Sequence, residues 1–90
     1  MVLGRVIGNV WATKKEESLS GYKLMIVEII SADESKTGEE IIAVDMIGAG
    51  VSDMVIISKG SSARVTREDS LKAPIDAVIV GIVDGVELGG

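Results

Sequence analysis

Short hydrophobic segments rich in valine and isoleucine recur along the chain and alternate with charged or glycine-containing stretches. Short runs of β-branched residues between turn-forming residues are typical of β-strands. The pattern predicts five strands and loops between them. The predicted strands cover residues 2–12, 22–31, 41–47, 54–59 and 75–83, and the loops cover 14–21, 32–39, 48–53 and 60–74.

One segment between the last two strands has the pattern of a helix. Thr66 stands three positions before Asp69, which resembles a capping box, and Pro74 would end the helix after about two turns. Five strands with one short helix before the last predict an all-β fold. We expect a small closed or nearly closed barrel of the oligonucleotide-binding type, formed by residues 1–90 as a single domain.

The first and last strands are apolar on both faces. In the first strand, one face carries Val2, Val6, Val10 and Ala12, and the other carries Leu3, Ile7 and Trp11 with Arg5 and Asn9. In the last strand, Ile75, Ala77, Ile79 and Val83 alternate with Val78, Val80 and Ile82. A sheet with one solvated face should instead alternate apolar and polar residues. One face can fill the barrel, and we expect a neighbouring subunit to cover the other.

The composition points to the same conclusion and excludes several classes of function. Hydrophobic residues make up 47% of only 90 residues, and a domain of this size buries only about 60% of its surface. The net charge of −5 argues against a nucleic-acid binder, which needs a basic surface. The chain has no Cys and no His, so it lacks disulfides, thiolate metal sites and the commonest acid–base residue.

Nothing in the sequence indicates a membrane protein. The longest apolar run, residues 77–83, is too short to span a bilayer. The first ten residues have a charge inside the apolar run and no cleavage-site pattern, so they do not resemble a signal peptide. We expect a cytoplasmic protein.

The cluster Gly48-Ala49-Gly50 raises the possibility of a phosphate site. A dinucleotide-binding fingerprint needs a third glycine followed by a helix. Position 53 is Asp53, and the residues after it have the pattern of a strand. An acidic side chain in the loop would also repel phosphate. We therefore interpret the cluster as a tight turn or a close approach of two backbones.

The second cluster is Gly60-Ser61-Ser62-Ala63-Arg64, which could present a serine nucleophile. A nucleophilic serine needs a base and a group that orients the base, and the sequence provides no histidine. We interpret this segment as a loop whose hydroxyls satisfy backbone groups and whose Arg64 pairs with a carboxylate.

Individual carboxylates and aromatic residues also need an interpretation. Asp45 shares a strand face with apolar residues, so it needs hydrogen bonds or a charged partner, and it could form an acid–base pair with Asp76. We favour a structural carboxylate, with Arg5 or Arg64 as its partner. The two aromatics, Trp11 and Tyr22, are too few for a base-stacking platform. We expect Trp11 in the core or at a subunit contact.

Several segments taken together resemble a known family. They are LGRVIGNVWATKK (3–15), SLSGYKLMIVE (18–28), VDMIGAGVSDMVII (44–57), GSSAR (60–64) and API-DAVIVGIVD (73–84). In order and spacing they are similar to the pentameric vertex proteins of bacterial microcompartments, over nearly the whole chain. The resemblance implies an oligonucleotide-binding-like barrel that forms a homopentamer and caps the vertices of a shell whose facets are tiled by hexameric proteins. It implies a structural role, with no catalysis and no cofactor.

The resemblance also implies roles for both clusters. Gly48, Ala49 and Gly50 would lie near the five-fold axis, and Gly60, Ser61, Ser62, Ala63 and Arg64 would lie at subunit or shell contacts. The chain departs from the family pattern at Ser52-Asp53, where relatives commonly have Gly-Glu. It ends at Gly90, whereas carboxysome relatives run on, so it resembles the branch from metabolic compartments.

Two other hypotheses remain open from the residues alone. One is a single barrel that binds a small ligand or an oligonucleotide in its groove. The other is a small hydrolase that uses Asp45, Asp53 or Asp76, with a divalent metal held by oxygen ligands.

Overall fold

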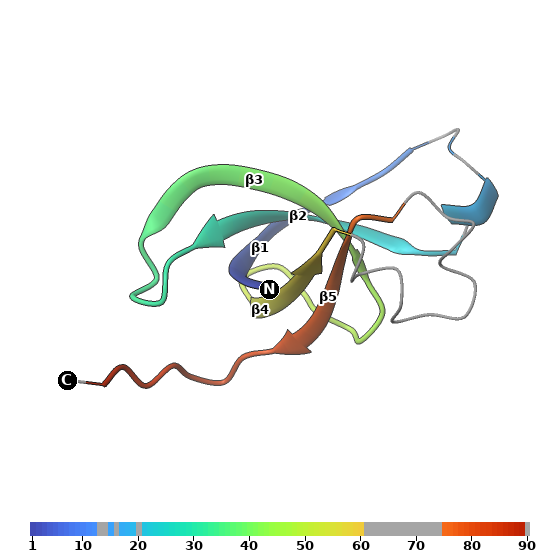
Figure 1. Ribbon diagram of the computed structural model, residues 1–90. Coiled ribbons are helices and arrows are strands. Elements are labelled where there is room, and N and C mark those ends of the chain that lie inside the picture. The colour runs from blue at the N-terminus through green and yellow to red at the C-terminus, as the bar shows by residue number, and fades with distance from the viewer. Residues whose placement is uncertain (13–14, 16, 20, 61–74, 90) are drawn as a thin grey trace.

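The computed structural model describes residues 1–12, 15, 17–19, 21–60 and 75–89 (Figure 1). These residues form five strands and one short 3₁₀ turn. The elements are β1 (Val2–Val10), η1 (Glu17–Leu19), β2 (Lys23–Ile30), β3 (Lys36–Asp45), β4 (Met54–Lys59) and β5 (Ala77–Ile82). The short helix predicted after Thr66 lies outside the described residues and stays a prediction. The described part of the chain contains the 3₁₀ turn and no α-helix.

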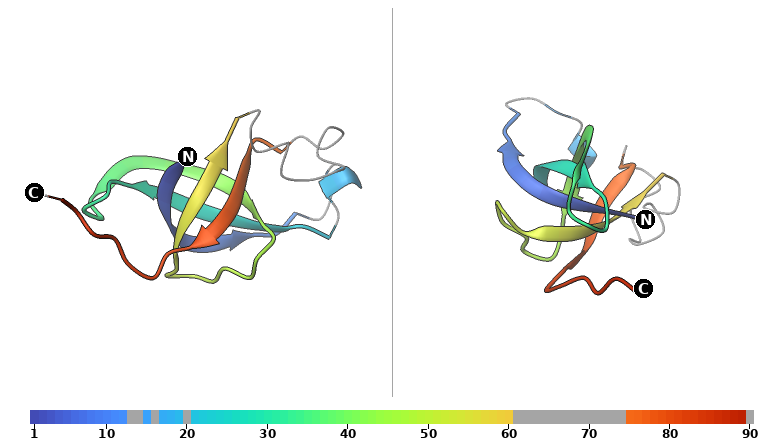
Figure 2. Two further views of the ribbon diagram at one scale, coloured as in Figure 1. Left: turned by 60° about the horizontal axis from the view of Figure 1, so that its bottom comes forward. Right: turned by 90° about the vertical axis from the view of Figure 1, so that its left-hand side faces the viewer.

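The five strands close into a barrel in the order β1-β2-β3-β5-β4, which confirms the predicted all-β barrel. Neighbouring strands are antiparallel except for β3 and β5, which run parallel. The barrel closes where β1 pairs with β4, in a register that matches Val2 with Ile57 and Arg5 with Met54. In the left view of Figure 2, β4 and β5 cross in front of β2 and β3.

The third strand begins at Lys36, so the prediction of a loop over residues 32–39 is wrong in its second half. The first five residues of β3 are polar and exposed, and they therefore lack the apolar signal of a strand. They are held in the sheet by pairing with β2, with Lys36 opposite Ile30 and Glu40 opposite Glu28. The Thr37 hydroxyl also donates a hydrogen bond of 2.9 Å to the carbonyl of Ile29. The β2–β3 hairpin consequently extends beyond the barrel, at the left of Figure 1.

The turn of this hairpin is stabilised by its own side chains. The carboxylate of Asp33 accepts hydrogen bonds from the Ser35 hydroxyl at 2.7 Å and from the Ser35 backbone N–H at 3.0 Å. These bonds, the hydroxyl first, lower the pKa of Asp33 below its ordinary value. The turn is therefore locally ordered although its residues are exposed.

The inward faces of the strands form one core. Its fully buried members include Val6, Met25, Val27, Ala43, Val55, Ile57 and Ile79. Gly4 lies where β1 packs closest to this core. A Cβ at Gly4 would overlap Cγ1 of Val27 and lie 2.9 Å from Cδ1 of Ile57. Glycine fits here because the core side chains of Val27 and Ile57 fill the space that a Cβ would need.

Many apolar side chains remain on the outside of the barrel. The exposed ones include Ile7, Trp11, Ile42, Met46, Ile47, Val51, Val80, Ile82, Val86 and Leu88. Trp11 is 92% exposed, so the option that it packs in the protomer core is wrong. The outer apolar surface agrees with the two-sided strands of the sequence. Such a surface usually marks a contact with another protein.

The segment after β5 leaves the barrel as an extended chain, drawn in red in Figure 1. It starts from a hydrogen bond of 2.8 Å between the N–H of Val83 and the carbonyl of Met54. Among the described residues, no helix has the length and apolar character needed to cross a membrane.

Candidate functional site

The turn between β3 and β4, residues 46–53, contains the first small-residue cluster. Gly48 is exposed and has a φ of +91°, Gly50 is half-buried, and Ala49 is completely buried in the barrel core. The side chain of Ala49 therefore points into its own protomer. The exposed side chains of the turn are Met46, Ile47, Val51 and Ser52.

Three hydrogen bonds fix the conformation of this turn from within the protomer. The ammonium of Lys23 donates to the carbonyl of Ala49 at 2.9 Å. The N–H of Gly50 donates to Oδ2 of Asp53 at 2.8 Å, and the N–H of Asp53 donates to the carbonyl of Gly50 at 3.0 Å. Asp53 therefore braces the turn, and β4 follows it directly. Both facts agree with a tight turn and oppose a dinucleotide site, which needs a helix at this place.

The same turn is attached to β1. The N–H of Ser52 donates to the carbonyl of Val6 at 2.8 Å, and the N–H of Val6 donates to the carbonyl of Asp53 at 3.0 Å. The Arg5 guanidinium donates to the carbonyl of Ser52 at 3.0 Å and forms an ion pair with Glu34. Hydrogen bonds to Val6 and to Arg5 thus attach the turn to β1.

Ser52 keeps the turn geometry that a glycine would adopt easily. Its φ is +82°, in the left-handed region that residues with a Cβ rarely occupy. Glycine occupies this region without a steric cost, whereas a residue with a Cβ pays about 1 kcal/mol.

Asp45 lies at the end of β3 with a side chain that is only 1% exposed. Its Oδ1 accepts a hydrogen bond of 3.1 Å from the N–H of Ile47, and its Oδ2 lies 3.9 Å from the ammonium of Lys23. Arg5, which we expected as a partner, is instead engaged by Glu34 and Ser52. It lies opposite Glu28 of β2, whereas Asp45 lies opposite Lys23. The other expected partner, Arg64, lies outside the described residues. This geometry supports a structural carboxylate.

Asp76 is separated from this arrangement. It is exposed and borders a groove on the outside of the barrel, whereas the Asp45 carboxylate is buried and held by Ile47 and Lys23. The structure gives no support to an acid–base pair of these two residues. Among the described residues, no three acidic side chains gather closely enough to hold a metal ion.

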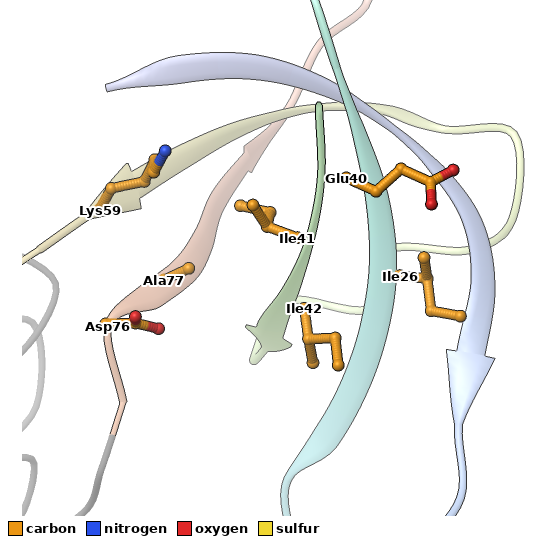
Figure 3. A pocket seen from close by; sticks show the side chains of 7 residues that line it. All are labelled: Ile26, Glu40, Ile41, Ile42, Lys59, Asp76 and Ala77. Atoms are coloured by element: carbon orange, nitrogen blue, oxygen red, sulfur yellow. The ribbon is translucent and has the colours of Figure 1, made fainter. Parts of the chain in front are cut away.

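The groove, which the sequence did not reveal, opens where β3 and β5 part. These strands pair only at Val44–Val78 and Asp45–Ile79, so the earlier part of β3 separates from β5. The space between them has a volume of about 570 Å³ (Figure 3). It is lined by Ile26, Glu40, Ile41, Ile42, Lys59, Asp76 and Ala77.

The groove has an apolar floor and an acidic rim. In Figure 3, Lys59, Asp76 and Ala77 lie on one side, Ile26, Glu40 and Ile42 lie on the other, and Ile41 lies between them. Lys59 forms an ion pair with Glu39 at 3.3 Å. Among the described residues of the rim, the carboxylates of Glu40 and Asp76 outnumber the ammonium of Lys59, so this part of the rim is acidic.

The second small-residue cluster is described only at its first member. Gly60 is exposed, has a φ of +71°, and donates its N–H to the carbonyl of Asp76 at 2.7 Å. This bond fixes the end of β4 beside the start of β5. Ser61, Ser62, Ala63 and Arg64 lie outside the described residues, so their predicted contacts stay predictions.

Comparison with known proteins gives consistent matches over nearly the full chain. Residues 1–84 match the sequence profile of a family described as "Ethanolamine utilisation protein EutN/carboxysome". The bacterial microcompartment shell vertex protein GrpN of Rhodospirillum rubrum is 49% identical, over 97% of each chain. The shell vertex protein EutN of Salmonella typhimurium is 39% identical, over 100% of this chain and 90% of the relative.

Solved structures show the same similarity in three dimensions. The pentameric microcompartment shell protein GrpN from Rhodospirillum rubrum superposes with a TM-score of 0.88 at 46% identity and covers 100% of both chains. CcmL from Gloeobacter violaceus superposes with a TM-score of 0.90 at 38% identity, over 98% of this chain and 90% of that one.

Proposed function

The chain belongs to the EutN/CcmL family, and on this basis we propose that it is a shell protein whose homopentamer caps the vertices of a polyhedral bacterial microcompartment in the cytoplasm. The observation that carries this proposal is the match, over all of both chains, to a solved pentameric shell protein at 46% identity. The apolar outer surface of the protomer supports it further, because a ring would bury that surface.

The proposed mechanism is one of shape. Each protomer presents one surface to the neighbour before it and a different surface to the neighbour after it, and the rotation closes at five copies. Five such units are needed because a sheet of hexagons closes only where pentagons are inserted. The function requires a rigid wedge, and the closed barrel with its locked 46–53 turn supplies one.

We place Gly48, Ala49 and Gly50 of the 46–53 turn near the five-fold axis. Its small residues support this placement, because five turns can converge only where side chains are small. The burial of Ala49 refines the proposal: Gly48 and Gly50 would face the axis, and Ala49 would contribute backbone only. We place the segment Gly60 to Arg64 at subunit or shell contacts, supported by the exposure of Gly60 beside the groove.

The partners at the outer edge of the ring would be the hexameric shell proteins. Each contact would be modest and polar, and five identical contacts on one ring would add avidity. A catalytic role has no support, because Asp45 and Asp53 are both occupied with backbone N–H groups of their own turn. We therefore propose a structural protein without a cofactor.

Native mass spectrometry of the purified protein tests this proposal directly. The subunit is 9.4 kDa, so a homopentamer has a mass of about 47 kDa. Co-expression with shell hexamers, followed by electron microscopy, should then show closed shells that become open at the vertices when this protein is omitted. A monomer would favour the ligand-binding barrel, and a hexamer would contradict the vertex role.

A further inference from the structure

We propose that the indole of Trp11 in each subunit occupies the groove between β3 and β5 of the neighbouring subunit. This inference rests on the proposed homopentamer and assigns one specific contact within it. The contact would be heterologous, with Trp11 as the inserted group and the groove as its receptor.

Trp11 is the most exposed large hydrophobic residue of the described chain, at 92%. It directly follows Val10, the last residue of β1, and we call residues 11–12 the Trp11 arm. The end of β1 points away from the barrel body, at the right of Figure 1. A tryptophan gains more from burial than most residues, and tryptophans are enriched among the residues that dominate binding energy at protein interfaces. A free protomer therefore exposes to solvent an aromatic side chain that a protein contact could bury.

The groove has the properties of a socket for an indole ring. Its apolar floor is formed by isoleucines from β2 and β3 and by Ala77 of β5. Its volume of about 570 Å³ leaves room for a bicyclic ring together with part of the backbone beside it. The indole N–H is a donor with no acceptor capacity, and the carboxylates of Glu40 and Asp76 at the rim are acceptors.

The charges around the two surfaces are complementary. Lys15 borders the same surface hollow as Trp11. Among the described residues that line the groove, the two carboxylates of Glu40 and Asp76 outnumber the single ammonium of Lys59, which also pairs with Glu39. Opposite charges at the edge of a contact favour its orientation and speed association.

The geometry requires the groove of another subunit. Trp11 is not among the residues that line the groove of its own protomer, and its exposure shows that it lies outside that groove. Trp11 and the groove are two different surfaces of one chain. A contact between two different surfaces repeats from subunit to subunit and closes into a ring when the rotation allows it.

The extended segment after β5 is the competing occupant from a second copy, because Val86 and Leu88 are exposed. This segment also carries Asp84 and Glu87. Inserting it would bring two more carboxylates to an acidic rim. Lys15 borders the hollow beside Trp11, so the charges favour Trp11.

Trp11 is the only tryptophan, so its intrinsic fluorescence reports on this one contact. The experiment measures native mass and tryptophan emission on the same wild-type sample, together with quenching by acrylamide. In the ring, we expect emission at shorter wavelength than that of the urea-unfolded chain and reduced quenching. Dilution that dissociates the ring should shift the emission back towards that of free tryptophan in water.

Two matched variants test whether the groove between β3 and β5 is the binding site of the indole. Ile42→Gln changes a groove residue that is 53% exposed, and Ile7→Gln makes the same change at a residue that is 43% exposed and lies outside the groove. We expect I42Q to move the Trp11 emission to longer wavelength and to weaken ring formation about tenfold or more, as expected for a hot-spot contact. We expect I7Q to retain the wild-type emission.

The outcomes separate this inference from the proposed function. A pentamer in which Trp11 emits and is quenched like free tryptophan would overturn the contact and leave the vertex role standing. A pentamer with shielded Trp11 whose emission is the same in I42Q and wild type would overturn the groove as its socket. A protein that is monomeric at all concentrations would overturn both the ring and the contact.

Discussion

The 46–53 turn and the Trp11 arm are both exposed parts of one small barrel, yet they are stabilised in different ways. The turn is held by its own protomer, through Lys23, Asp53 and the buried side chain of Ala49. The Trp11 arm carries a tryptophan that is 92% exposed. The difference shows that the conformation of the turn is set within the protomer, whereas the Trp11 side chain can be buried only by another molecule. In the proposed pentamer, five copies of this turn would converge at the axis and would need a fixed conformation in advance, whereas Trp11 would be buried only on contact.

Introducing the same charge into the two regions should separate them most strongly. Ala49→Asp places a carboxylate in the barrel core, and we expect a loss of about 3 kcal/mol or more in the free energy of unfolding, enough to unfold many protomers. Trp11→Asp should leave the protomer folded and reduce ring formation. Far-UV circular dichroism and urea unfolding measure the first effect, and native mass measures the second. An A49D protein as stable as W11D would show that the turn is not anchored in the core.

A smaller change within the turn tests its internal brace. Asp53→Ala removes the acceptor of the Gly50 N–H, and we expect the free energy of unfolding to fall by about 1–2 kcal/mol. Asp53→Asn keeps an acceptor of the same shape and should lose less. Urea midpoints at one fixed protein concentration compare the two variants, because the stability of an oligomer depends on concentration. Equal losses in D53A and D53N would mean that the charge, not the hydrogen bond, stabilises the turn.

The two regions also differ in how far the sequence predicts them. The strands follow from the valine and isoleucine runs, because β-branched residues favour the extended backbone of a strand. The polar start of β3 was missed because residues 36–40 are held by backbone pairing with β2 and carry no apolar signal.

The partner of Asp45 was missed for a related reason. Lys23 and Asp45 face each other across β2 and β3, and this pair becomes visible only once the register is known. The predicted hairpin of these two strands could have indicated it, because opposite charges are favoured at facing positions. The groove could not be predicted, since it arises where β3 and β5 separate, and no local residue pattern encodes that separation.

Lys23 connects Asp45 to the turn, so its removal tests whether the turn depends on that connection. Lys23→Met removes the hydrogen bond to the Ala49 carbonyl and the positive charge near the Asp45 carboxylate. We expect the free energy of unfolding to fall by about 1 kcal/mol. Lys36→Met is the matched control, because Lys36 is 77% exposed and lies 3.9 Å from Glu28 in a surface pair of little energetic value. Thermal and urea unfolding of both variants provide the comparison. A loss in K36M as large as in K23M would show that only the net charge matters.

The smallest expected effect has the opposite sign and concerns the one residue of the turn that is strained. Ser52 holds a φ of +82°, which costs a residue with a Cβ about 1 kcal/mol, and glycine would relieve it while losing some entropy on folding. We expect Ser52→Gly to raise the free energy of unfolding by about 0.5 kcal/mol. Ser52→Ala keeps the Cβ and the strain, so it should bring no gain. If S52G were less stable than wild type in urea unfolding, the Ser52 side chain would stabilise the fold by more than its backbone strain costs. The turn would then depend on a side-chain contact in addition to its backbone hydrogen bonds.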